Sequence, residues 1–193
     1  MSKRGTVFLK GEYYHLYNRG VNRNPIFMED KNYEFLLKRI RKYFRRDTIT
    51  MIAYCLMPNH YHFLVRQDGD ILVSDAIQAI FNSYTKAINK LYLLSGALFE
   101  SRFKSIHISD TSHLLHLCRY IHLNPINGEK PLVKRVENWP YSNLPDWIGI
   151  SDDELIDRQF IKEKFGDSEN YLHFLNDYQG KDDSSDNPKY FID

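Results

Sequence analysis

Two histidines, His60 and His62, stand two positions apart in the otherwise apolar stretch YCLMPNHYHFLV at residues 54–65. Alternate residues of a β-strand share one face, so the two imidazoles would project side by side, about 6.5–7 Å apart along the backbone. Two imidazole nitrogens at that separation can reach one divalent ion at about 2.0–2.2 Å each. Histidines of the core or the surface are the structural alternative, because a His-x-His sequence often arises by chance.

A tyrosine and an asparagine add further chemistry in the stretch CRYIHLNP, residues 118–125. On a helix, Tyr120 and Asn124 are four positions apart and lie on one face. A phenol is a nucleophile once it loses its proton, which needs help because its ordinary pKa is about 10. The amide oxygen of an asparagine is a ligand for hard cations. Packing is the structural alternative for Tyr120, because most of the chain's 14 tyrosines must support the fold.

The elements that must position these residues follow from hydrophobic periodicity. Alternating or β-branched apolar residues predict strands over residues 12–20, 48–58, 60–67 and 101–110. Apolar residues at helical spacing predict helices over residues 28–47, 71–96 and 110–125. Residues 126–150 have no clear period, and residues 151–178 fit one or two amphipathic helices.

Local signals predict where the helices begin and end. Asp30 is expected to cap the first helix, and Gly96 is expected to end the second. The expected cap of the third helix is Asp110, Thr111 or Ser112. Pro125 is expected to end it, because the residue before a proline avoids the α region.

The order of these elements is β-α-β-β-α-β followed by a further helix. It predicts an α+β protein with a ferredoxin-like, split βαβ fold, in which two helices cover one face of an antiparallel sheet. His60 and His62 would project from the opposite face or at the edge of the helical layer, and the further helix would carry Tyr120. Such a fold hosts many functions, so it identifies none alone.

Charge is unevenly distributed along the 193 residues, although the formal net charge is only +1. Residues 1–150 hold 21 Lys and Arg against 13 Asp and Glu, whereas residues 151–193 hold 5 against 12. A basic body with an acidic end is typical of proteins that bind nucleic acid. A solvated helix face followed by a soluble tail would give the same count.

Other features indicate a cytoplasmic protein. No apolar run approaches the roughly 20 residues of a membrane span, and the first residues, MSKRGTVFLKGEYYHLYN, lack the apolar core of a signal peptide. Cys55 and Cys118 lie in apolar stretches without Cys-x-x-Cys spacing, so we expect reduced, buried thiols.

The stretches MPNHYHFLV and RYIHLNP together resemble the single-tyrosine HUH transposases, which nick DNA and are named for a His, a bulky apolar residue and a His. The stretches YYHLYNRGVNRNPIF and LFESRFKS are similar to the branch of REP-associated tyrosine transposases. The resemblance covers about residues 12–145. Two positions depart from the wider pattern: Tyr61 is a polar choice for the middle residue, and Asn124 stands where related insertion-sequence enzymes usually have Gln.

The resemblance implies a mechanism and a role for each matched residue. His60, His62 and Asn124 would bind Mg²⁺ or Mn²⁺, and Tyr120 would attack a phosphate of single-stranded DNA folded as a hairpin. A 5′-phosphotyrosine link and a free 3′-OH would result. In the insertion-sequence enzymes strands are usually exchanged between two subunits, but relatives include both dimers and monomers. The resemblance therefore implies either a homodimer that exchanges strands or a monomer that cleaves repeats in place.

Basic and aromatic residues would supply the affinity for DNA. We expect phosphate contacts from Arg19 and Arg23, which follow the first strand. The segment ESRFKS would add Arg102 and Lys104. A basic row on the first helix would add Lys38, Arg41, Lys42 and Arg45. Phe99, Phe103 and Tyr14 would either stack on unpaired bases or pack in the core.

The expected organisation is a HUH domain over residues 1–150, a helical extension over 151–178 and an acidic, disordered tail over 179–193. That tail would lie over the basic cleft and compete with DNA, or simply remain solvated. The protein would act in the cytoplasm and associate with the nucleoid when bound to DNA. The alternative function is a non-catalytic protein of the same fold that binds DNA hairpins.

Overall fold

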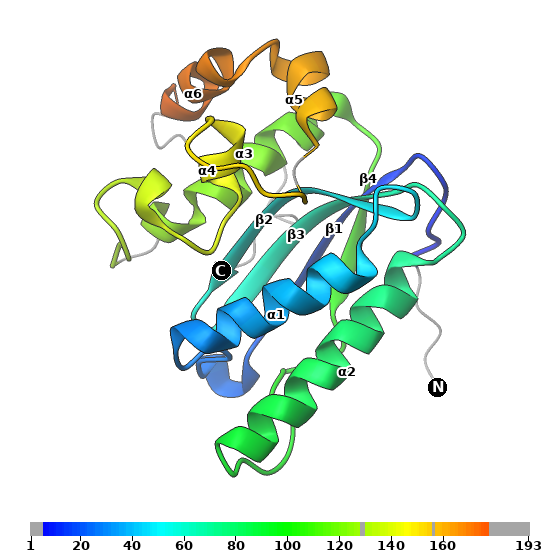
Figure 1. The fold of residues 1–193 in the computed structure, drawn as a ribbon, viewed down its shortest axis with the longest axis vertical. Helices are drawn as coiled ribbons and strands as arrows, with labels where there is room; N and C mark the ends of the chain where they lie inside the picture. Colours follow the sequence, from blue (N-terminus) through cyan, green and yellow to red (C-terminus); the bar gives the residue numbers. More distant parts are fainter. Residues whose placement is uncertain (1–5, 128–129, 156, 178–193) are drawn as a thin grey trace.

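An antiparallel sheet forms the centre of the protein (Figure 1). The structure, a computed structural model, describes residues 6–127, 130–155 and 157–177. Within them, four strands lie in the order β2-β3-β1-β4. Their bounds are Tyr13–Arg19 for β1, Ile49–Met57 for β2, His60–Gln67 for β3 and Lys104–Ile108 for β4. The two central strands, β1 and β3, therefore carry the residues that lie deepest in the sheet.

Helices α1 (Asp30–Tyr43) and α2 (Val73–Leu91) cover one face of the sheet (Figure 1). Alternate side chains of the central strands point toward these helices, so Leu16 of β1 and Phe63 of β3 are fully buried in one core with residues of both helices. This arrangement confirms the predicted α+β, ferredoxin-like fold with two helices on one face.

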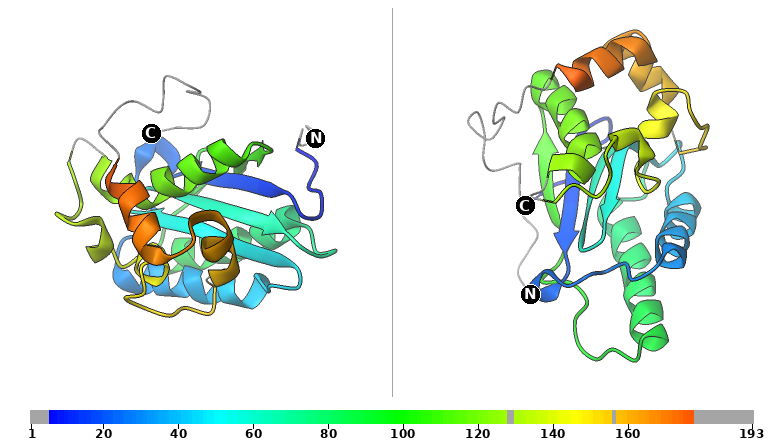
Figure 2. Two further views of the ribbon diagram at one scale, coloured as in Figure 1. Left: turned by 90° about the horizontal axis from the view of Figure 1, so that it is seen from above. Right: turned by 90° about the vertical axis from the view of Figure 1, so that its left-hand side faces the viewer.

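Helix α3 (Thr111–Asn127) crosses the opposite face, as the two turned views in Figure 2 show. A second core forms there, where Leu117 and Ile121 of α3 pack with Leu64 of β3. Asp110 caps the start of α3, because its Oδ1 accepts a hydrogen bond from the His113 N–H at 2.7 Å. Of the three residues that the sequence offers as the cap, the structure thus uses Asp110.

The C-terminal helices complete the second core. Helices α5 (Arg158–Phe165) and α6 (Ser168–Asn176) contribute apolar side chains to it, and the short elements η2 (Val136–Asn138) and α4 (Leu144–Trp147) lie in the stretch that was expected to be irregular. The segment after residue 150 therefore packs against α3 and is not a loose appendage. The expected acidic tail over residues 179–193 lies outside the described residues.

Two helix ends differ from the prediction. Helix α1 begins at Asp30 itself, because Asn32 Oδ1 accepts hydrogen bonds from the N–H groups of Met28 and Glu29 at 2.9 and 3.2 Å. Helix α2 ends at Leu91, five residues before Gly96. Leu93 adopts a left-handed backbone with φ +54°, which stops the helix before the glycine is reached.

Pro125 does not end α3, which continues to Asn127. The prediction was wrong because it weighed only the local preference of the residue before a proline. Asn124 is buried and its side chain contacts His60 on β3, and this tertiary contact holds it in the helix. Helix α3 therefore presents Asn124 to the sheet.

Two further expectations concern the cysteines and the membrane. Cys55 and Cys118 are free and buried, as predicted. Within the part of the chain that the structure describes, no helix combines the length and the hydrophobicity that crossing a bilayer requires.

Candidate active site

The two histidines of the His-x-His stretch lie on the face of the sheet that α3 covers. Strands β2 and β3 are joined by a tight turn at Pro58 and Asn59, and His60 is the first residue of β3. The rings of His60 and His62 have their centroids 5.1 Å apart and are nearly perpendicular. Tyr61 points the other way and packs against Phe81 of α2. The alternation of β3 thus directs both imidazoles to one side.

Helix α3 brings Asn124 and Tyr120 to the same two histidines. Oδ1 of Asn124 lies 3.0 Å from Nε2 of His60. One helical turn earlier, the ring of Tyr120 meets His62 edge-on, with centroids 5.3 Å apart. Four residues that were singled out in two distant stretches of sequence therefore converge. Tyr120 is only 8% exposed.

The donor atoms of this group fit a divalent cation. Nε2 of His62 is buried and has no hydrogen-bond partner among the described residues, so its lone pair is available to an ion. Adjacent ligands of an octahedral ion at about 2.1 Å lie roughly 3.0 Å apart, which matches the 3.0 Å between His60 Nε2 and Asn124 Oδ1. Within the described residues, no group of three or more His, Cys, Asp and Glu could hold a metal ion, so a site here depends on the asparagine amide.

Burial keeps the inner histidines neutral. It lowers the pKa of His62 well below its ordinary value, and the neighbouring His15 and His60 lower it further. Burial also lowers the pKa of His15 to about 3, with a smaller contribution from His113. A neutral imidazole keeps one free lone pair, and the neutral form is the one that binds metals.

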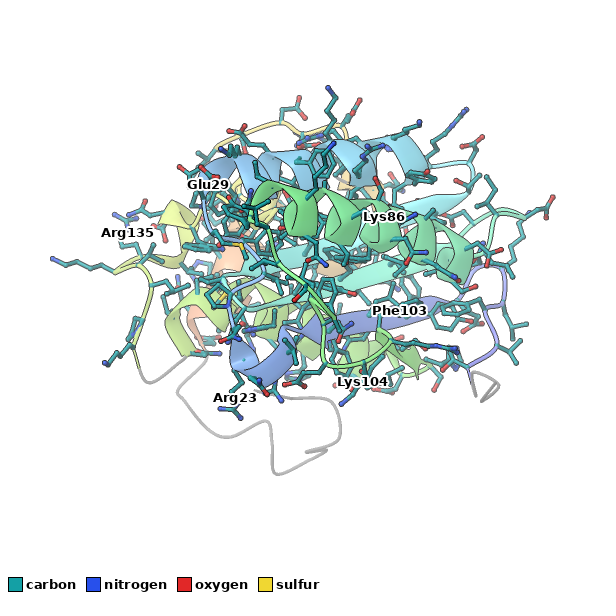
Figure 3. All side chains as sticks on the ribbon, turned by 90° about the horizontal axis from the view of Figure 1, so that it is seen from below. Arg23, Glu29, Lys86, Phe103, Lys104 and Arg135 are labelled. Carbon is teal, nitrogen blue, oxygen red and sulfur yellow. The ribbon has the colours of Figure 1, made fainter. Side chains whose placement is uncertain are left out.

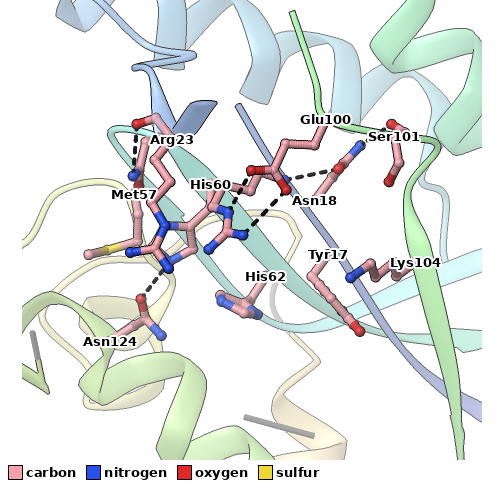
Figure 4. A pocket seen from close by; sticks show the side chains of 12 residues that line it. Tyr17, Asn18, Arg23, Met57, His60, His62, Glu100, Ser101, Lys104 and Asn124 are labelled. Atoms are coloured by element: carbon pink, nitrogen blue, oxygen red, sulfur yellow. Dashed lines mark hydrogen bonds and ion pairs between the residues drawn. The ribbon is translucent and has the colours of Figure 1, made fainter. Parts of the chain in front are cut away.

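Three of the four converging residues border a pocket of about 220 Å³ (Figure 4). His60, His62 and Asn124 lie on one side of it, and Arg19, Arg23, Glu100 and Lys104 lie around the rest. Arg19 pairs with Glu100, with Nε 3.1 Å from Oε1. Lys104 Nζ lies 5.7 Å from the ring centre of Tyr17, which also lines the pocket. Burial raises the pKa of Tyr17.

The loop after β1 carries Arg23 to the pocket. Gly20 N–H donates to Asn59 O at 2.8 Å, and Asn59 Nδ2 donates to Arg23 O at 3.2 Å, so the loop is tied to the β2–β3 turn. A Cβ on Gly20 would lie 2.1 Å from Asn24 O, so only glycine fits this close approach. The turn that begins β3 therefore fixes both His60 and Arg23.

A second, larger groove of about 900 Å³ adjoins the pocket and shares Asn18, Glu100 and Ser101 with it. Phe99, Phe103 and Arg102 line this groove. The two phenylalanines are half-buried, so part of each ring is accessible. Tyr14 was expected to stack on bases or pack in the core, and it packs in the core, fully buried, with its hydroxyl donating to Val7 O at 3.0 Å.

The basic row of the first helix does not border the pocket. Lys38, Arg41 and Lys42 belong to α1, which covers the face of the sheet opposite α3. Arg41 forms an ion pair with Asp153, and Arg45, just beyond α1, pairs with Asp47 at 3.3 Å. The structure thus separates the predicted DNA-binding residues into a pocket group and an α1 group.

Sequence reasoning gave no role to two residues that lie beside the histidines. Nε2 of His15 lies 2.9 Å from Nδ1 of His62, and Tyr17 stacks on the His62 ring with centroids 6.0 Å apart. Both follow from β1 being the neighbour of β3. The alternation of His15, Tyr17 and Arg19 along one strand was the available signal, but it does not reveal which strand lies next to β1.

Comparisons with known proteins match the part of the chain that carries these residues. The model of the family described as "Transposase IS200 like" matches residues 9–124, which include all four converging residues. No curated protein matches the chain.

Two solved structures are similar to the chain. A REP-associated tyrosine transposase bound to a REP hairpin has 22% identity and a TM-score of 0.64, and the match covers 82% of this chain and 98% of that one. A candidate transposase from Deinococcus radiodurans R1 has 16% identity and a TM-score of 0.41, with 63% and 95% covered. At its level of identity, the first match establishes a shared fold.

Proposed function

The chain belongs to the family of IS200-like transposases, and from this premise we propose that it cuts and rejoins single-stranded DNA at hairpins through a covalent link to Tyr120. The observation that carries the proposal is the convergence of His60, His62, Asn124 and Tyr120, which come from β3 and α3. A protein that only bound hairpins would not need this combination of a nucleophile and three ligand atoms.

The first step of the proposed reaction is an attack by the Tyr120 hydroxyl oxygen on the scissile phosphorus. The phenol loses its proton, a bond forms between the phenol oxygen and phosphorus, and the bond from phosphorus to the 3′ oxygen breaks. The 3′ oxygen takes up a proton and leaves as a 3′-OH. A second 3′-OH then attacks the phosphotyrosine and releases Tyr120, so the phosphodiester is restored without ATP.

His60, His62 and Asn124 are the residues that would hold Mg²⁺ or Mn²⁺. When bound, the ion would polarise the scissile phosphate and offset the negative charge that grows on its oxygens during attack. The two imidazoles and the amide are neutral ligands, so they add no negative charge where a polyanion must enter. Arg23 and Lys104 at the pocket would attract and orient the phosphates.

The proposed substrate is a DNA hairpin with a single-stranded flank. The solved relative is bound to a REP hairpin, and a hairpin of this general kind is the substrate class we propose here. Phe99 and Phe103 beside Arg102 offer partly accessible rings on which unpaired bases of the flank would stack. Exchange of strands between two sites would require two copies of the chain, which is why a homodimer remains part of the proposal.

A gel assay of hairpin cleavage tests the proposal. The protein is mixed with Mg²⁺ or Mn²⁺ and a pool of end-labelled single-stranded hairpins from the DNA around its own gene. We expect a shortened DNA product and a protein band that carries label after denaturation. Tyr120→Phe should abolish both while it binds hairpins with unchanged affinity, because only the hydroxyl is removed.

The same assay separates the alternative function. A non-catalytic hairpin-binding protein would bind a member of the pool tightly, yet neither the wild-type protein nor the variant would yield product or a labelled band. Label retained by Tyr120→Phe would instead reject Tyr120 as the nucleophile.

A further inference from the structure

A buried histidine on β1 contacts His62 from behind the pocket. His15 is fully buried, and its Nε2 lies 2.9 Å from Nδ1 of His62. The two rings are stacked, with centroids 5.1 Å apart and planes 22° apart. Nε2 of His62 faces away from this bond and has no hydrogen-bond partner among the described residues. His62 therefore has one nitrogen committed to His15 and one nitrogen free.

The proton in this bond decides what the free nitrogen can do. A neutral imidazole carries one N–H and one lone pair. If His15 donated its Nε2–H, Nδ1 of His62 would be the acceptor and the proton of His62 would sit on Nε2, where it would block a cation. If His62 donated its Nδ1–H to Nε2 of His15, Nε2 of His62 would keep its lone pair. Only the second arrangement leaves a ligand atom.

We propose that His15 is a positioning residue that accepts the Nδ1–H of His62 and so holds the Nε2 lone pair of His62 available to a divalent cation. This inference rests on the metal site of the proposed function. Metal-binding histidines generally donate their other N–H to a partner that fixes the tautomer and the ring orientation. In this protein the partner is a second imidazole.

The choice of an imidazole as partner has a physical consequence. A carboxylate in this place would bring a negative charge close to the site where a phosphate must enter. A neutral imidazole can accept the same hydrogen bond through its lone pair without bringing that charge. His62 is the central residue of the arrangement, because it contacts His15 on one side and Tyr120 on the other.

Binding of Mn²⁺ in the absence of DNA tests the inference. Electron paramagnetic resonance of free Mn²⁺ gives its affinity for the wild-type protein and for His62→Ala, His15→Phe and His15→Gln. We expect His15→Phe to weaken binding about 10- to 100-fold. His15→Gln should restore much of the affinity, because its amide oxygen can accept the Nδ1–H. His107→Phe, the same change on strand β4 at a side chain that pairs with Glu12, should bind like wild type.

Nuclear magnetic resonance of the imidazole nitrogens supplies a readout that a merely structural role would not move. In the wild-type protein without a metal ion, His62 should carry its proton on Nδ1. This experiment uses no variant, so it decides the matter even if His15→Phe fails to fold. A proton on Nε2 of His62 in the metal-free protein would overturn the assignment.

The outcomes separate this inference from the function on which it rests. Wild-type binding that His62→Ala abolishes and His15→Phe leaves unchanged would reject His15 alone. No Mn²⁺ binding by the wild-type protein would reject the metal site and, with it, the role of His15. Weak binding by His15→Phe with recovery in His15→Gln supports both.

Discussion

At the scale of single residues, the pocket that we propose binds DNA contains a carboxylate, which repels the phosphates of that DNA. Glu100 pairs with Arg19 at 3.1 Å, and both side chains are partly exposed. A DNA phosphate must compete with this carboxylate for the guanidinium and is repelled by it. Glu100→Gln should therefore tighten hairpin binding roughly two- to fivefold at low salt, and the gain should shrink as salt is added. Fluorescence anisotropy of a labelled hairpin measures both effects.

Glu154→Gln is the matched control for this prediction. Glu154 lies 3.9 Å from Arg41 and is mostly exposed, so its removal changes the net charge equally but away from the pocket. Equal affinity gains in the two variants would show that the effect comes from the net charge alone. They would contradict a local competition between Glu100 and the DNA.

The residue scale also shows what spacing along the chain can reveal. His60 and His62 share a face because strand residues alternate, and Tyr120 and Asn124 share a face because a helix turns every 3.6 residues. Each pair could be predicted from the sequence. That His15 would meet His62 could not, because the two are 47 positions apart and meet only through the register between β1 and β3.

At the scale of elements, the C-terminal helices support the helix that carries Tyr120. His122 of α3 is fully buried, with Nδ1 2.5 Å from the hydroxyl of Tyr171 on α6 and Nε2 3.0 Å from Oδ1 of Asn143. Tyr171→Phe removes the hydroxyl and leaves the buried Nδ1 without a partner. It should lower the free energy of unfolding by about 1–3 kcal/mol, as measured by urea denaturation.

Tyr43→Phe is the control for this prediction. Tyr43 ends α1 and is half-buried, so the same loss of a hydroxyl there should change the free energy of unfolding by less than about 0.5 kcal/mol. Equal destabilisation by the two substitutions would show that the hydrogen bond between His122 of α3 and Tyr171 of α6 stabilises the fold no more than a half-buried hydroxyl elsewhere does.

Elements were predicted well in number and order but less well at their ends. The strands and the three long helices follow from hydrophobic period, which the core enforces along each element. The ends of the helices depend on single contacts, which the hydrophobic period of the sequence does not reveal. Asn124 remains helical before Pro125 because it contacts His60, and α2 stops because Leu93 takes a left-handed backbone.

At the scale of the whole molecule, two groups of basic residues lie on different sides. Figure 3 shows Arg23 and Lys104 along one side of the molecule, with α1 on the opposite side. The sheet and the packed helices separate the two groups, and salt screens exposed charges beyond about 10 Å at 0.1 M. The pocket group should therefore dominate the affinity for the hairpin.

Two double variants test this arrangement. Arg23→Ala with Lys104→Ala should weaken hairpin binding by about tenfold or more, because hydrogen bonds to charged groups contribute about 1.5–3 kcal/mol each. Lys38→Ala with Lys42→Ala removes the same charge from α1 and should change the affinity less than about twofold. Comparable losses in both variants would mean that the DNA also follows α1.

Composition alone could not have separated these groups. The sequence indicates an excess of basic residues before position 150, and that excess is consistent with a nucleic-acid partner. Which of those residues surround the pocket depends on which face of the sheet each helix covers. Helix α1 crosses the face opposite α3, so its basic row lies away from His60 and His62.

The central claim is that Tyr120 becomes linked to DNA, and identification of the linked tyrosine tests it most directly. Tyr120 and Tyr17 both contact His62, but trypsin separates them. Tyr17 lies in the peptide of residues 11–19, whereas Tyr120 is the only tyrosine between residues 105 and 130. The protein is reacted with a hairpin and Mn²⁺, digested with nuclease and trypsin, and analysed by mass spectrometry. We predict a residual nucleotide on the peptide that contains Tyr120; a nucleotide on the Tyr17 peptide, or on neither peptide after DNA has been cut, would contradict the account.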